Sequence, residues 1–152
     1  MAAVLLTWNP GPDDDGRWSP PQWAATVVAA CRTADGFATT WGVGQHVHGI
    51  GPGTAAYLYR QGAHGRGIVA RGEITSDPWR GPHPQRPGWT RNHVDVRWRE
   101  AVPLDDAVRV EELEAAVPGF AWRQVYGSGR RLPAPADEQL ARVWAERVAD
   151  AG

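Results

Sequence analysis

A chain of 152 residues with a formal net charge of −1 is long enough for one domain with a real core and too short for two comfortable ones. All 16 basic residues are arginines, and the lack of lysine excludes a Walker A phosphate loop, Schiff-base catalysis and lysine-dependent nuclease sites. A single cysteine excludes an intramolecular disulfide and a cysteine-rich zinc site. Because the chain has neither a membrane-length apolar run nor a leader-like start, we expect a cytoplasmic protein without a membrane partner.

The N-terminal half is predicted to contain one helix and four strands. An apolar run over residues 2–8 ends at Asn9 and a Pro-Gly turn, which is typical of a strand. Ser19 followed by two prolines predicts a helix start, and apolar spacing extends that helix to Arg32. Gly72, within the last predicted strand of this half, indicates a position where a missing side chain lets another group approach the backbone closely. The three strands after the helix are expected over residues 37–42, 54–60 and 68–75.

The C-terminal half begins with residues 76–92, which are rich in Pro, Gly and Arg and predict a long irregular loop. Strict alternation over residues 93–99 predicts a half-buried antiparallel strand. We then expect an acidic helix, an extended segment, a glycine-rich turn and an amphipathic helix, over residues 105–116, 120–126, 127–129 and 137–149. The predicted fold is α+β, as a single domain over residues 1–152. It is a curved, partly closed antiparallel β-barrel of five to six strands with two to three flanking helices.

Nine tryptophans are more than a core of this size requires. Trp23, Trp98 and Trp144 lie on apolar faces and are predicted to be core residues, whereas the pattern assigns no role to Trp18. The others lie at strand ends or in loops, where aromatic planes can grip a flat heterocycle with about 1–3 kcal/mol of stacking per base. These are Trp8, Trp41, Trp79, Trp89 and Trp122. Polar groups beside such a slot, such as Asn9 and Ser128, would read the edge of an extruded base.

Catalytic and metal motifs are weak. His46 and His48 share one side of an extended segment, but no helix-spaced partner or matching acid accompanies them. Ser128 lies in a Gly-Ser-Gly turn that does not fit a nucleophile elbow. We therefore expect no enzyme activity, no cofactor and no metal site.

Basic residues concentrate in the middle of the chain, where residues 60–99 hold eight arginines against three acidic residues. This distribution suits an anionic partner held by one face, although arginines spread over a solvated surface would give the same count. The candidate phosphate-binding residues are Arg60, Arg66, Arg71, Arg80, Arg91 and Arg130.

Six short motifs between Val4 and Trp144 resemble the EVE-type branch of the PUA-like superfamily. They are LLTWNP, TTWGVG, YLYRQG, RGIVARGEITS, VDVRW and W-x5-SG followed by a C-terminal helix with a tryptophan. The resemblance is greatest to the bacterial form that occurs alone or fused to HNH-type nuclease domains in modification-dependent restriction. The superfamily also contains YTH domains, which hold a methylated adenine of RNA in an aromatic cage.

The resemblance implies a small barrel with a base-binding pocket at one end. Trp8 and Asn9 would come from the first strand, and an aromatic side chain from the long loop would complete the cage. The implied base-binding residues are Trp8, Asn9, Trp41, Gly42, Trp79 or Trp89, Ser128 and Gly129. Because the chain has no nuclease domain of its own, cleavage would require a separate nuclease or other effector. The neighbouring ASCH branch, which includes enzymes, relies on a lysine-bearing motif that this chain lacks.

The predicted function is a non-enzymatic reader of a modified nucleobase, foremost 5-methylcytosine or 5-hydroxymethylcytosine in DNA, flipped into an aromatic cage. Two alternatives use the same pocket, for modified RNA or for a small nucleoside-like ligand. An enzyme acting on a nucleotide or small amide, and a structural interaction module, are the remaining alternatives.

Overall fold

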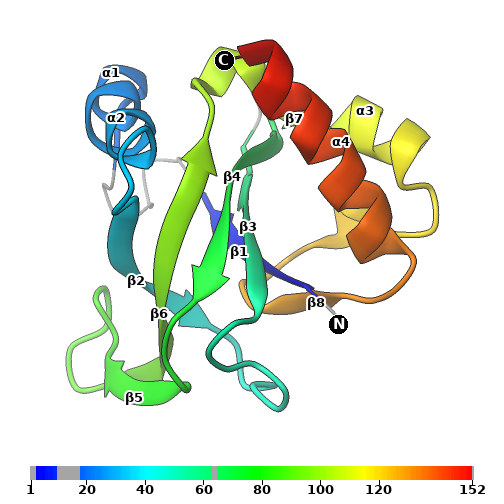
Figure 1. The fold of residues 1–152 in the computed structure, drawn as a ribbon. Coiled ribbons are helices and arrows are strands. Elements are labelled where there is room, and N and C mark those ends of the chain that lie inside the picture. Colours follow the sequence, from blue (N-terminus) through cyan, green and yellow to red (C-terminus); the bar gives the residue numbers. More distant parts are fainter. Residues whose placement is uncertain (1–2, 10–17, 63–64, 152) are drawn as a thin grey trace.

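A curved sheet of eight strands separates two groups of helices (Figure 1). The computed structural model describes residues 3–9, 18–62 and 65–151. The strands are β1 (Ala3–Trp8), β2 (Phe37–Val43), β3 (Ala55–Arg60), β4 (Gly67–Ile74), β5 (Trp79–Pro82), β6 (Thr90–Ala101), β7 (Val108–Arg109) and β8 (Arg130–Leu132). The helices are α1 (Pro20–Trp23), the π-helical η1 (Ala24–Val28), α2 (Ala29–Cys31), α3 (Val110–Ala116) and α4 (Ala136–Ala151). Two short 3₁₀ turns, η2 (Leu104–Asp106) and η3 (Trp122–Gln124), complete the set.

The strand order is β2-β6-β4-β3-β1-β8, with β5 paired to β6 and β7 paired to β4. The α+β class and the curved sheet with flanking helices are confirmed. The sheet is mixed, not wholly antiparallel, because β1 pairs with β3 in parallel. The chain leaves β1 through a helix and β2 before it returns to β3, and this long connection permits a parallel pair. The five long strands are the predicted ones, and the additional strands β5, β7 and β8 are short.

The first helix begins where the sequence predicts. Ser19 Oγ accepts a hydrogen bond from the Gln22 amide at 3.3 Å, and Gln22 Oε1 accepts one from the Ser19 amide at 2.8 Å. This reciprocal pair is a capping box, which satisfies two backbone donors at the helix start. The helix continues without interruption through η1 to Cys31, and it buries Trp23 and Val27 against the sheet.

Two hydrophobic cores lie on opposite faces of the sheet, because alternate strand residues point to opposite sides. Leu6 and Leu58 belong to the core beneath the first helix, whereas their neighbours Leu5 and Tyr57 belong to the core covered by α3 and α4. Trp23 and Trp98 are fully buried in the first core and Trp144 in the second, so all three predicted core tryptophans are confirmed. Below, the two groups are called the first core and the second core.

The structure corrects two local predictions. Residues 76–92 are not irregular throughout, since β5 pairs with the start of β6 from Trp79↔His93 to Pro82↔Thr90 and forms a hairpin. The segment predicted to be extended contains η3, which buries Trp122. The close approach predicted at Gly72 is confirmed, because a Cβ atom built there would lie 2.0 Å from the Arg97 carbonyl oxygen. No helix in the described ranges is long and apolar enough to cross a bilayer.

Candidate functional site

Side-chain and turn contacts join β1 to β2, although these strands do not pair in the sheet. Trp41 Nε1 on β2 donates to the Thr7 carbonyl oxygen on β1 at 2.9 Å. The Thr7 amide donates in turn to Ser128 Oγ at 3.1 Å, and the Gly44 amide donates to the Ser128 carbonyl oxygen at 2.9 Å. These bonds bring three sequence-predicted site residues, Trp8, Trp41 and Ser128, to one end of the curved sheet.

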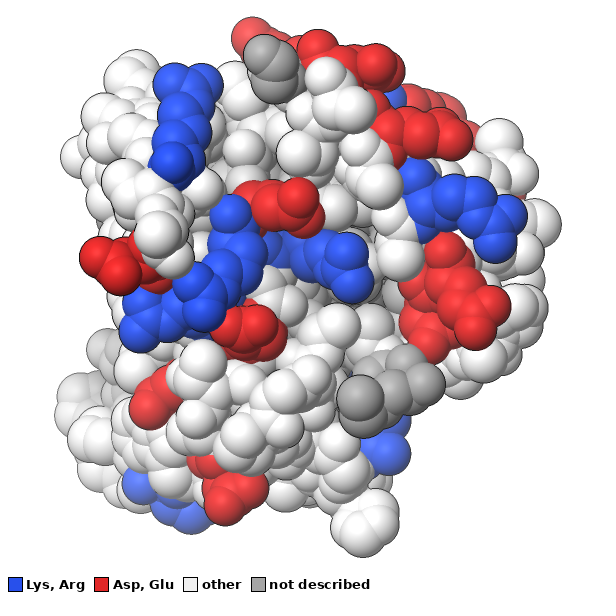
Figure 2. Space-filling view, in the orientation of Figure 1, with Lys and Arg blue, Asp and Glu red and all other residues white. Residues whose placement is uncertain are grey.

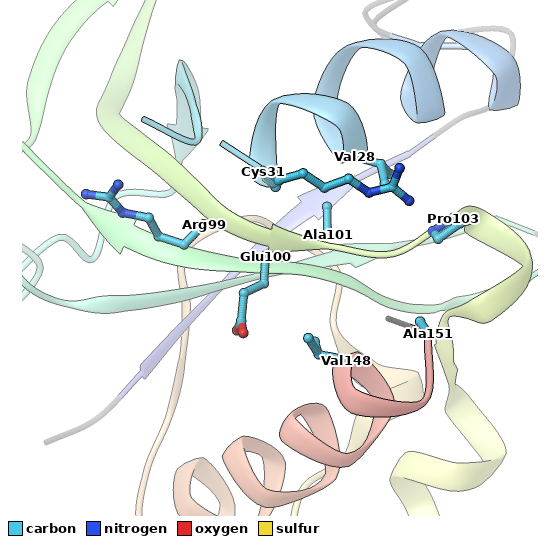
Figure 3. Close-up of a pocket in the computed structure, with 9 residues that line it drawn as sticks. Val28, Cys31, Arg99, Glu100, Ala101, Pro103, Val148 and Ala151 are labelled. Carbon is cyan, nitrogen blue, oxygen red and sulfur yellow. The ribbon is translucent and has the colours of Figure 1, made fainter. Parts of the chain in front are cut away.

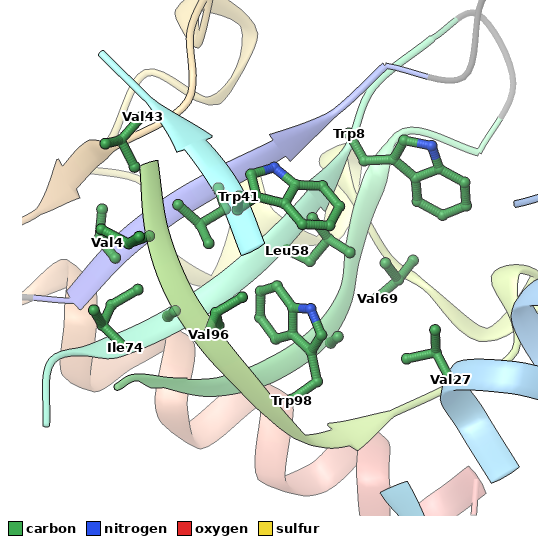
Figure 4. Packing of buried hydrophobic residues seen from close by; sticks show 14 of the residues in the cluster. Val4, Trp8, Val27, Trp41, Val43, Leu58, Val69, Ile74, Val96 and Trp98 are labelled. Atoms are coloured by element: carbon green, nitrogen blue, oxygen red, sulfur yellow. The ribbon is translucent and has the colours of Figure 1, made fainter. Parts of the chain in front are cut away.

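Five tryptophans pack together at this end and are called here the tryptophan cluster: Trp8, Trp18, Trp23, Trp41 and Trp98. Trp8 stacks on Trp23, with ring centroids 5.2 Å apart, and Trp41 meets Trp98 edge to face at 6.1 Å. Figure 4 shows Trp8, Trp41 and Trp98 directed into the same interior. Trp8 and Trp41 are only 2% and 3% exposed, so the predicted cage walls are covered in this structure.

Trp18 is the half-buried member that covers the others. Its ring lies nearly parallel to that of Trp41, at 6.0 Å and 25°, and edge-on to Trp8 at 5.5 Å. Sequence reasoning left this residue without a role, but a signal was present. Trp18 directly precedes the helix cap, and such a residue packs against the fourth helical position, here Trp23 at 5.3 Å.

Two buried indole donors of the tryptophan cluster have no acceptor among the described residues. No described residue accepts a hydrogen bond from Trp8 Nε1 or Trp98 Nε1, whereas Trp23 Nε1 donates to the Val102 carbonyl oxygen at 2.8 Å. An unsatisfied buried donor costs about 1–3 kcal/mol, and such groups are rare in native structures. An acceptor on a ligand at this end would offset that cost at Trp8.

A hollow of about 420 Å³ lies on the other side of Ser128. Gly129 forms part of its wall with φ of +94°, and a Cβ atom there would lie 3.1 Å from Val43 Cβ, so glycine is needed at this position. The lining residues, none of them acidic, are Gly44, Gln45, His46, Gln124, Tyr126, Gly127, Ser128, Gly129, Arg130 and Arg131. Pockets of about 300–1,000 Å³ are typical of small-molecule sites, and the two arginines favour an anionic ligand.

The two loop tryptophans lie on the β5–β6 hairpin and not in the tryptophan cluster. Trp79 stacks on His93 at 4.6 Å and donates through Nε1 to Asp95 Oδ1 at 3.1 Å. Trp89 is 61% exposed, with the Arg86 guanidinium 5.2 Å from its ring centroid. Among the described residues, no ring contact joins either tryptophan to Trp41. In this structure neither one completes a cage with Trp41.

The predicted phosphate-binding arginines do not share one surface. Arg60 lies over Trp8 at 5.3 Å, and burial together with the charge of Arg109 lowers the pKa of Arg60. The Arg91 guanidinium covers Gly42, where a Cβ atom would lie 2.5 Å from Arg91 Cζ. Arg60 and Arg91 are therefore the predicted arginines that contact the tryptophan end.

The other four arginines lie elsewhere. Arg66 and Arg71 lie over Tyr59 and Tyr57, whose rings belong to the second core. Arg80 is on the hairpin, where its Nη2 donates to Thr90 Oγ1, and Arg130 lines the hollow. Figure 2 shows basic and acidic side chains next to one another, not a wholly basic face. The predicted basic middle is thus divided among several surfaces. Asn9 is exposed directly after β1.

A second cleft, of about 390 Å³, lies between α2, β6 and α4 (Figure 3). Two of its charged side chains are already engaged, because Glu100 Oε1 accepts from Trp144 Nε1 at 3.0 Å and Arg99 pairs with Glu73 at 2.9 Å. Burial and the charge of Glu100 raise the pKa of Cys31 to about 11, which keeps this thiol protonated and unreactive at neutral pH. Among the described residues, no group of three His, Cys, Asp or Glu side chains is placed to hold a metal ion.

Comparisons with known proteins show the fold. No family model matches the chain, and no curated protein sequence matches it. A hypothetical protein from Leishmania major superposes with a TM-score of 0.64 at 12% identity, over 97% of this chain and 96% of that one. Human THYN1, solved in complex with 5-methylcytosine containing DNA, superposes with a TM-score of 0.61 at 14% identity, over 97% of this chain and 98% of that one. A Pseudomonas syringae protein superposes with a TM-score of 0.60 at 14% identity, over 95% of this chain and 99% of that one.

These likenesses extend over nearly the whole of each chain and confirm the PUA-like fold predicted from the sequence. The assignment to the EVE-type branch rests on the sequence motifs and stays a prediction. The narrower assignment, to the bacterial form associated with HNH-type nucleases, stays a prediction.

Proposed function

We propose that this protein is a non-enzymatic reader that binds a modified nucleobase where β1 and β2 meet, foremost 5-methylcytosine or 5-hydroxymethylcytosine in DNA. The observation that carries the proposal is the stacked pair of Trp18 and Trp41. The Trp41 ring is held in place by its hydrogen bond to the Thr7 carbonyl oxygen, and the Trp18 ring is half-buried at the surface. Such a pair is suited to hold a flat heterocycle between its planes.

The distance between the Trp18 and Trp41 rings determines how far Trp18 must move to admit a base. Two rings that sandwich a third lie roughly 7–8 Å apart, twice the optimal separation of non-bonded carbons. The centroids of Trp18 and Trp41 are 6.0 Å apart, so Trp18 must move outward by about 1–2 Å to admit a base. That movement also uncovers Trp8, whose indole N–H is then available to an oxygen on the edge of the base.

The charges at this end suit a polynucleotide strand. Arg60 lies against Trp8, and Arg91 lies against Gly42 beside Trp41, so both flank the proposed base position. Each phosphate neutralised by such a residue steepens the loss of affinity with salt. Among its structural neighbours, THYN1 was solved with 5-methylcytosine containing DNA, and this supports the choice of ligand. We also propose that a nuclease or other effector acts with this reader.

The hollow beside Ser128 favours a second candidate function. Its volume of about 420 Å³, its two arginines and the exposed ring of Tyr126 would accommodate a free nucleotide-like ligand without any duplex. Modified RNA is the corresponding alternative for the tryptophan end, and a preference for it would depend on contacts to the 2′-hydroxyl.

The test is a fluorescence-anisotropy titration at fixed salt with one duplex that carries cytosine, 5-methylcytosine or 5-hydroxymethylcytosine, beside its RNA counterpart. Trp18→Ala, which removes one wall of the sandwich, should weaken binding of the preferred modified DNA by about 5- to 150-fold, and Trp18→Phe should restore most of it. Tyr126→Ala is the control for the hollow. Equal binding of all duplexes, or loss of binding with Tyr126→Ala alone, would contradict the proposal in favour of the second candidate.

A further inference from the structure

The β5–β6 hairpin is a rigid projection next to the proposed base site. Its strands pair over four positions, and its turn is closed by bonds from the His83 amide to the Trp89 carbonyl at 2.8 Å and from the Trp89 amide to the Arg86 carbonyl at 3.0 Å. Figure 1 shows the hairpin at the lower left, away from α3 and α4. The projection is thus preorganised and needs little ordering to bind a partner.

The composition of the hairpin suits a polyanion. Residues 78–94 contain Arg80, Arg86 and Arg91 and no acidic residue. Among the described residues, neither Arg80 nor Arg86 has a carboxylate ion pair, whereas Arg99, Arg123 and Arg147 each have one. Arg80 is instead oriented by Thr90 Oγ1. The hairpin therefore presents positive charge that the rest of the described structure does not neutralise.

Its two tryptophans have different surroundings. Trp79 is held on His93 and Asp95, so its ring serves to stiffen the base of the hairpin. Trp89 is 61% exposed and touches the Arg86 guanidinium, which leaves most of its ring open to a partner. An exposed indole beside arginine, on an element without acidic residues, is a stacking platform for nucleobases.

The hairpin is physically joined to the proposed base site. Arg91 lies over Gly42, which is on β2, and Asn92 Nδ2 donates to the carbonyl oxygen of Gly44, just after β2, at 3.1 Å. Two contacts therefore join the hairpin to the C-terminal end of β2. Trp41 pairs with Val94, which is five residues from Trp89 along the strand, or about 17 Å. Trp89 is therefore too far away to touch a base held by Trp41, but it lies within reach of the flanking duplex.

We infer that the β5–β6 hairpin is a second DNA contact, in which Trp89 stacks on bases next to the extruded one and Arg80 and Arg86 bind the flanking phosphates. This inference rests on the proposed function. A two-stranded β-ribbon fits the major groove of DNA, and side chains that insert at a base step stabilise distorted duplexes. The hairpin thus supplies affinity for the duplex, while the tryptophan cluster recognises the modified base.

The experiment compares Trp89→Ala with wild type on two probes: a duplex of about 15 base pairs with one 5-methylcytosine, and the free nucleoside 5-methyl-2′-deoxycytidine. Trp89→Ala should weaken duplex binding by about 5- to 100-fold and leave nucleoside binding unchanged. Arg86→Ala should reduce the salt slope of duplex binding by about 0.9, whereas the matched control Arg142→Ala, on the exposed face of α4, should not.

The outcomes separate the two proposals. Unchanged duplex binding with Trp89→Ala, or an equal loss on both probes, would overturn the inference. If wild type binds modified and unmodified duplexes equally but Trp89→Ala still weakens both, the proposed function fails and the hairpin contact stands. Since Trp89 is largely exposed, its replacement should leave the unfolding midpoint unchanged, and circular dichroism checks this.

Discussion

Trp41 Nε1 donates a hydrogen bond to the Thr7 carbonyl oxygen at 2.9 Å, across two strands that do not pair in the sheet. The same peptide region is bound from the other side, because the Thr7 amide donates to Ser128 Oγ. Thr7 therefore positions the aromatic plane and the polar turn relative to each other. This relationship links the fold to the proposed site, since the end of the barrel closes through the same groups that would contact a base.

Replacement of Trp41 by phenylalanine should affect both stability and binding. The Thr7 carbonyl loses its donor and the smaller ring leaves a gap, so we expect a loss of about 2–4 kcal/mol in the free energy of unfolding. Urea unfolding measures this change. Trp144→Phe is the matched control, because it loses a comparable bond, to Glu100, in the second core. Both variants should be destabilised, but only Trp41→Phe should lose preference for modified DNA; equal binding by the two would contradict the role of Trp41.

Gly129→Ala should destabilise the turn that carries Ser128. Its φ of +94° is unfavourable for alanine, and the added Cβ would lie 3.1 Å from Val43 Cβ. We expect a cost of roughly 1–3 kcal/mol. Gly127→Ala is the control two residues away, where a Cβ atom meets nothing within 4 Å. A melting temperature that falls equally in both variants would show that the turn is not constrained as described.

Gly42→Ala tests the contact between Arg91 and the end of β2. The added Cβ would overlap the Arg91 guanidinium, which is the flexible end of a long side chain and can move aside. Stability should therefore change by less than about 1 kcal/mol, whereas affinity for modified DNA at low salt should fall by about 3- to 10-fold as Arg91 is displaced. Arg91→Ala should give the same loss. Full affinity in both variants would remove Arg91 from the proposed phosphate contacts.

Cys31 should react slowly with alkylating reagents. Burial and the charge of Glu100 raise its pKa from the ordinary value of 9.0 to about 11. Only the thiolate reacts, so at pH 8 the folded protein should hold about 100-fold less reactive species than the unfolded chain. Because the folded pKa is raised, the thiol form stabilises the protein below pH 9, and this contribution is lost as the pH rises from 9 towards 11. Iodoacetamide labelling in buffer and in urea, with Cys31→Ser as the blank, gives the ratio of the alkylation rates of the folded and unfolded protein. Equal rates in the two conditions would contradict the raised pKa.

Much of the fold could be predicted from the sequence because local periodicity determines it. Apolar and β-type runs between turn residues identified four of the long strands, alternation identified the strand over residues 93–99, and Ser19 with its prolines marked the helix start. The β5–β6 hairpin was missed because proline and glycine in residues 76–92 mask the strand pattern. The parallel pairing of β1 with β3 depends on long-range contacts that no local pattern encodes.

The candidate site was harder to predict, since the number of arginines or tryptophans in a stretch of sequence does not show which way their side chains point. Arg60 and Arg71 are close in sequence, yet they lie over Trp8 and Tyr57, in different cores. A tryptophan at a strand end gives no sign of whether a neighbour covers it, as Trp18 covers Trp41. Trp18 itself could have been identified from its place before the helix cap.

The central claim is that a modified base stacks at Trp41 once Trp18 moves outward, and the indole ¹H–¹⁵N resonances of the nine tryptophans test it most directly. Single Trp→Phe variants assign the signals, and the protein is titrated with a short DNA strand that carries 5-methylcytosine or cytosine. We predict that the Trp8, Trp18 and Trp41 signals shift with the modified strand only, while Trp122 and Trp144, buried in the second core, stay unchanged. Equal shifts with both strands, or shifts confined to Trp79 and Trp89, would contradict the account.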